Sequence, residues 1–257
     1  MTSAPAPTAS AAATLRRDNA LAGVFHLAQA VAVLALATSF ALPVTSSYLA
    51  GPPGTPPADP ETLFEISTGA AVAAFLALSA LAHFLVTTVW WRRYLAHLAR
   101  GINPARWVEY SLSSSLMIVL IAQLVGIFDV AALICLFGVN ASMILFGWLQ
   151  ERYEEPRSGG WLPFVFGCVA GIVPWLAITV YLLSLGSASS VAPPGFVYGI
   201  FVSLFVFFNV FALNQWLQYR GRGRWADYLF GERIYILLSL TAKSALAWQV
   251  FAGTLAG

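Results

Sequence analysis

Hydrophobic side chains fill seven long segments of the chain, and connections rich in glycine, proline and arginine separate them. The pattern predicts helices at roughly 18–42, 62–91, 104–127, 130–151, 160–185, 194–219 and 228–255. Segments of this length cross about 30 Å of hydrocarbon at about 1.5 Å per residue. Only helical backbone satisfies its own hydrogen bonds inside lipid. We therefore expect an all-α, multi-pass protein of the cell membrane, folded as a bundle of seven transmembrane helices.

The rest of the chain lies outside these segments. Residues 1–17 begin with an Ala/Pro/Thr-rich stretch, which indicates a disordered tail before a membrane domain at 18–257. The connection at about 43–61 is rich in proline and glycine and fits either a surface loop or a small ordered cap. A composition of 59% hydrophobic and 9% charged residues excludes an ordinary soluble domain.

Positive charge is distributed unevenly among the connections. All twelve arginines precede the first segment or lie in alternate connections, and the remaining connections hold none. The positive-inside rule then places the N-terminus in the cytoplasm and the C-terminus outside. The arginines are Arg16, Arg17, Arg92, Arg93, Arg100, Arg106, Arg152, Arg157, Arg220, Arg222, Arg224 and Arg233.

The single lysine of the chain, Lys243, lies in the middle of the last hydrophobic segment. A charged amine at bilayer depth costs about 2.5–3.5 kcal/mol even on lenient scales, so it needs a partner or a chemical use. The use that fits best is covalent, a Schiff base with an aldehyde chromophore.

Glu109 is the acidic residue that we expect within the membrane, and His26 and His83 are the internal histidines. Counted along the helices, all three fall on the cytoplasmic side of Lys243. Taken singly, the carboxylate could extend to the interface and each imidazole could find a backbone partner. Together they favour a site, because a buried amine and a buried carboxylate compensate each other. Three serines lie one helical turn from these groups: Ser239, Ser79 and Ser113.

Two stretches of the chain resemble one family. Ser239-Leu-Thr-Ala-Lys-Ser-Ala-Leu-Ala-Trp-Gln-Val-Phe251 resembles the seventh-helix signature of heliorhodopsins, and Glu109-Tyr-Ser-Leu-Ser-Ser-Ser-Leu-Met117 is similar to their third-helix segment. The cytoplasmic N-terminus also resembles that family and opposes ordinary microbial rhodopsins. Ordinary microbial rhodopsins typically carry aspartate four residues before the lysine, where this chain has Ser239.

The resemblance implies all-trans retinal bound to Lys243 as a protonated Schiff base, with Glu109 as sole counterion. It further implies a polar, water-containing cavity with His26 and His83 on the cytoplasmic side, Ser239 and Ser79 near the Schiff base, and a homodimer. The chromophore needs a channel of large side chains, although such residues are also common in ordinary packing. The candidates are Met117, Met143, Trp175, Phe208 and Trp248.

These features favour a light-sensing photoreceptor, not an enzyme, whose proton is released into the cytoplasmic-side cavity. A light-driven transporter or channel is the alternative, and a multi-pass membrane enzyme is a remote one. We expect no ion pumping, because the extracellular half shows no second carboxylate. The expected partners are membrane lipid and an unknown cytoplasmic signalling protein, with no nucleic acid and no metal. Cys135 and Cys168 are expected to be buried structural thiols.

Overall fold

The computed structural model describes residues 7–183 and 193–255. Its elements are α1 (Ala9–Leu36), β1 (Ala41–Ser46), β2 (Glu61–Ser67), α2 (Thr68–Thr87), α3 (Trp91–Leu98), α4 (Pro104–Leu124), α5 (Val130–Tyr153), α6 (Leu162–Leu182), α7 (Gly195–Arg220), the 3₁₀ turn η1 (Gly223–Ala226), α8 (Tyr228–Val250) and the π-helical turn η2 (Phe251–Leu255).

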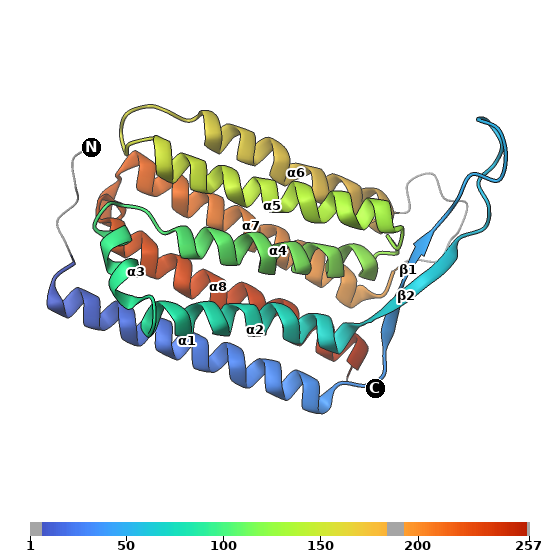
Figure 1. The fold of residues 1–257 in the computed structure, drawn as a ribbon, viewed down its shortest axis with the longest axis horizontal. Helices are drawn as coiled ribbons and strands as arrows, with labels where there is room; N and C mark the ends of the chain where they lie inside the picture. The colour runs from blue at the N-terminus through green and yellow to red at the C-terminus, as the bar shows by residue number, and fades with distance from the viewer. Residues whose placement is uncertain (1–6, 184–192, 256–257) are drawn as a thin grey trace.

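Seven of the helices in the described residues are long and apolar enough to cross a membrane, which confirms the expected number of spans. They form one bundle, in which α1 and α2 lie side by side and the α5–α6 pair lies farthest from them (Figure 1). Large apolar side chains such as Leu34, Ile134 and Val169 are exposed on the outside of the bundle. An exposed apolar belt around seven such helices fits lipid rather than water, so this is a multi-pass membrane protein.

The interior is divided between an apolar and a polar half. The main apolar cluster lies toward the β1–β2 hairpin and includes Val44, Phe75 and Leu246. The buried charged side chains Arg106, Glu151 and Glu232 lie in the other half, toward the end that carries α3 and the arginine-bearing connections. We call this end the arginine-rich end.

The N-terminal region differs from the prediction of a disordered tail through residue 17. α1 already begins at Ala9, because Thr8 caps it through an Oγ1 that accepts the backbone N–H of Ala11 at 3.2 Å. A run of alanines, the strongest helix former, follows this cap. Leu15 is buried within the bundle and anchors the extension.

The first connection is an ordered β-hairpin, so α1 ends earlier and α2 begins later than predicted. Residues 37–42 and 62–67 were expected to be helical, but β1 and β2 pair as antiparallel strands. Pro43 disfavours helix in the residue before it, and alternating β-branched and aromatic residues at 62–66 favour a strand. The hairpin projects beyond the end of the bundle opposite α3 (Figure 1) and contacts the α4–α5 turn through Thr45 N–H and Phe128 O at 2.9 Å.

The predicted helix at 62–91 also ends early, at Thr87, and α3 follows as a separate short helix in the expected connection. The remaining predicted bounds agree within three residues where the structure describes them, with η2 counted as the end of the last segment after α8. Residues 184 and 185 of the predicted fifth segment lie outside the described residues. Asn103, Asp129 and Asp227 cap the starts of α4, α5 and α8 with their side chains.

Close contacts of α5 with α4 and α6 depend on glycine. A Cβ at Gly167 would lie 3.4 Å from the backbone oxygen of Met143, so this small residue serves contact within the subunit. A Cβ at Gly147 would lie 2.6 Å from the Trp107 ring of α4. Cys135 and Cys168 are both exposed, which corrects the expectation of buried thiols.

We predict that Gly147→Ala lowers stability by about 1–3 kcal/mol, because the new methyl group displaces a packed indole ring. Gly138→Ala is the matched control on the same helix, since nothing lies within 4 Å of its added Cβ. Thermal unfolding of the detergent-solubilised protein measures both. Equal unfolding temperatures for the two variants would contradict the packing described here.

Candidate functional site

Lys243 and Glu109 form a buried ion pair between α8 and α4. The lysine Nζ lies 2.7 Å from Glu109 Oε1, and the two side chains are only 4% and 8% exposed. Nζ also donates to Ser79 Oγ of α2 at 2.6 Å and to Ser239 Oγ at 3.1 Å. An ammonium has three donors, and all three are satisfied here. Ser79 in turn donates to Glu109 Oε1 at 2.7 Å, so the charges share one network.

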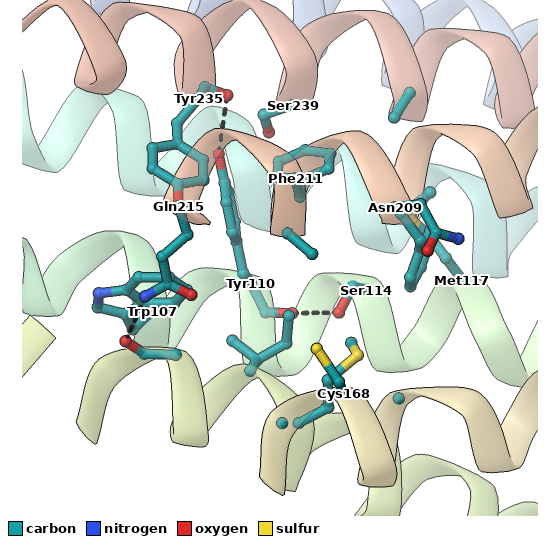
Figure 2. Close-up of a pocket in the computed structure, with 18 of the residues that line it drawn as sticks. Trp107, Tyr110, Ser114, Met117, Cys168, Asn209, Phe211, Gln215, Tyr235 and Ser239 are labelled. Atoms are coloured by element: carbon teal, nitrogen blue, oxygen red, sulfur yellow. Dashed lines mark hydrogen bonds between the residues drawn. The ribbon is translucent and has the colours of Figure 1, made fainter. Parts of the chain in front are cut away.

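The pair is positioned by helix geometry and by an aromatic neighbour. Ser239 precedes Lys243 by one turn, which places both on the same face of α8. The ring of Tyr110 lies 5.0 Å from Nζ, within the range of a cation–π contact. Tyr110 is fixed by its hydroxyl, which donates to the backbone oxygen of Tyr235 at 2.9 Å (Figure 2).

A largely apolar cavity of about 180 Å³ reaches Lys243 from between α4, α5, α6 and α7. Four of the five predicted channel residues line it: Met117, Met143, Trp175 and Phe208. Ser113 and Ser239 line it too, and Figure 2 shows Met117, Phe211 and Cys168 arranged around it. Its largely apolar lining, with Lys243 in its wall, suits the binding of an apolar molecule next to the lysine nitrogen.

The structure does not bring Trp248 to this cavity. Its side chain is 40% exposed, and its Nε1 donates to Gln29 Oε1 of α1 at 3.0 Å. Five residues of α-helix turn a side chain by about 140° from Lys243, so Trp248 points to another face of α8. The helical repeat alone could have excluded it.

His26 and His83 lie together on the arginine-rich side of the ion pair. Their rings stack at 5.6 Å, and His83 Nδ1 is 2.8 Å from Asn19 Oδ1. His83, Asn19 and Glu109 line a second, smaller cavity of about 40 Å³, enough for a few water molecules. His26 is fully buried behind His83, and neither of its nitrogens meets a protein hydrogen-bond partner.

A second buried ionic cluster was missed by the sequence reasoning, which placed Arg106 in a connection and Glu109 alone within the membrane. Arg106 Nη2 lies 2.6 Å from Glu151 Oε1, and Arg106 Nη1 pairs with Glu232. The spacing of residues in α8 could have predicted the burial of Glu232. Glu232, Ser239 and Lys243 follow one another at intervals of seven and four residues, which places them on one face of the helix.

Other lining residues were also missed, among them Tyr110, Phe211 and Tyr235. Two further polar residues make hydrogen bonds between helices. Asn140 Nδ2 donates to Ser114 Oγ at 2.9 Å, and Gln215 Nε2 donates to the Gly147 backbone oxygen at 2.8 Å (Figure 2).

The fold and site define a seven-helix membrane bundle in which a buried, paired amine borders an apolar cavity. The family profile described as heliorhodopsin matches residues 15–255, and the chain belongs to this family. Membership implies a retinal-binding protein of the photoreceptor type. A comparison with individually curated proteins finds no match.

We predict that Lys243→Met and Glu109→Gln each destabilise the retinal-free protein by about 3–5 kcal/mol, because each leaves a buried charge without its partner. The double variant should recover most of the loss, since neither charge remains. Unfolding of all four proteins in detergent gives the interaction energy. A loss in the double variant equal to the sum of the single losses would contradict the pairing.

Proposed function

We propose that this protein senses light through all-trans retinal bound covalently to Lys243, with Glu109 as the sole counterion. The observation that carries the proposal is the buried Lys243–Glu109 pair, whose lysine lines the apolar cavity. Met117, Met143, Trp175 and Phe208 would hold the polyene, as the cavity lining supports. Trp248 is left out of this set.

When bound, retinal supplies an aldehyde that condenses with the lysine amine with loss of water, and a polyene that light isomerises. The residues around the lysine contribute to this chemistry through their charges and hydrogen bonds. Glu109 lies 2.7 Å from the lysine nitrogen and favours its protonated form, while Ser79 and Ser239 hold both groups in place. A rotation of the N–H away from Glu109 weakens that stabilisation and lets the proton leave.

The released proton would be taken up on the arginine-rich side. His83 lines the small polar cavity beside Glu109, and its imidazole stacks on that of His26. An imidazole nitrogen is a group that can take up a proton. The two ring nitrogens of His26 have no hydrogen-bond partner among the described residues, which suits contact with water in this region.

Orientation follows from the arginines. We propose that the arginine-rich end, and with it the N-terminus, faces the cytoplasm and that the C-terminus faces outside the cell membrane. Ser239 stands one turn from Lys243 where a second carboxylate would serve a pump, so we favour signalling without ion transport. A homodimer and a cytoplasmic signalling partner belong to the same proposal. A sustained, ionophore-sensitive photocurrent would favour the transporter instead.

We predict that the purified protein mixed with all-trans retinal develops a visible absorption band and that Lys243→Ala abolishes it. Borohydride should trap a retinyl adduct on Lys243, which mass spectrometry of the peptides locates. Thr241→Val is the matched control, because Thr241 is exposed on the same helix and bonds only to its own helix backbone. A wild-type protein that stays colourless in excess retinal would refute the proposal.

A further inference from the structure

The polar cavity beside Glu109 ends at a cluster of charges that the proposed function leaves unused. Arg106, Glu151 and Glu232, here called the Arg106 cluster, come from α4, α5 and α8. Their side chains are 4%, 3% and 2% exposed. Buried ion clusters of this kind are often no more stable than apolar replacements, so stability alone is a weak reason for it.

Neutral donors surround the two carboxylates of the cluster. Asn103 donates its backbone N–H to Glu151 at 2.7 Å and its side-chain amide to Glu232 at 2.6 Å. Further hydrogen bonds to the two carboxylates come from Trp107, Tyr228 and Tyr94. Burial, and then the charge of Glu232, raise the pKa of Tyr94 well above its usual value, so its hydroxyl remains a donor.

A polar path joins the Lys243 site to the near side of this cluster. The small cavity has both Glu109 and Glu232 in its walls. Beside it, His83 contacts Asn19 at 2.8 Å, Asn19 contacts the Tyr94 hydroxyl at 3.4 Å, and that hydroxyl contacts Glu232 at 3.3 Å. A proton released near Glu109 therefore has a polar cavity to cross as far as Glu232.

At Glu232 the path meets Arg106, which lines the same cavity. A guanidinium carries only donors and cannot be deprotonated in a protein, so it cannot relay a proton. Its fixed charge also opposes the passage of hydronium, as arginine does in proton-excluding pores. The rings of Tyr235 and Trp107 pack against it, with centroids 4.0 Å and 4.6 Å from the guanidinium carbon, and occupy the space around it.

We propose that the Arg106 cluster is the proton barrier between the polar cavity and the aqueous phase at the arginine-rich end. Glu232 is its inner carboxylate, facing the cavity, and Arg106 is the charge that prevents onward transfer to Glu151. The barrier keeps the proton of the photocycle inside the protein, and this inference rests on the proposed function.

The test uses retinal-loaded protein in lipid vesicles with pH-sensitive dyes inside and outside, excited by single flashes. Wild type and Glu232→Gln, which keeps Arg106 paired with Glu151, should give no proton signal in either bulk phase. Arg106→Gln combined with Glu232→Gln should release protons transiently on the arginine-rich side, at least tenfold above the wild-type background. The absorption band of each variant verifies that the Lys243 site is intact.

A double variant as silent as wild type would overturn the proposal, and so would a Glu232→Gln control that releases as many protons as the double variant. If the double variant takes up no retinal, Arg106→Gln is compared with Arg106→Lys. Release in the first and silence in the second are expected, and silence in both overturns the barrier. A colourless wild type, by contrast, refutes the proposed function itself.

Discussion

The structure depends on one electrostatic constraint: a single ammonium in a membrane bundle must be neutralised where it lies. Lys243 meets this constraint through one carboxylate and two serines, drawn from α4, α2 and α8. Because the medium around them is apolar, either charge alone would be expensive, and each therefore restricts where the other helix can lie. The apolar cavity reaches this nitrogen, and a ligand bound there would meet a Lys243–Glu109 pair that is already assembled.

Much of this arrangement could be read from the sequence, because a charge inside an apolar run is a strong signal. Lys243, Glu109 and His83 each interrupt a hydrophobic segment and meet near one another in the bundle. The spans followed from segment length alone. The hairpin was harder to predict, since the apolar run at 62–66 suits a strand as well as a helix until its partner strand is known.

Residues near helix ends were the main source of error. Arg106 and Glu232 lie within the first turns of α4 and α8, where charged side chains usually reach water, so nothing local marked them as buried. Their burial results from the meeting of α4, α5 and α8, which no single segment encodes. The prediction for Trp248 was wrong for the opposite reason. A tryptophan side chain suits a chromophore pocket, but the position of Trp248 on α8 turns it away from the cavity.

The central claim is that Glu109 alone balances the charge on the Lys243 nitrogen. Spectral titration of the retinal-loaded protein tests it most directly, with Glu109→Gln compared against Glu232→Gln, the other cavity carboxylate. An opposite charge favours the protonated nitrogen, so in Glu109→Gln the visible band should be lost at a pH lower by about 1–3 units, while Glu232→Gln should titrate as wild type. An unchanged titration in Glu109→Gln, or an equal shift in Glu232→Gln, would contradict the account.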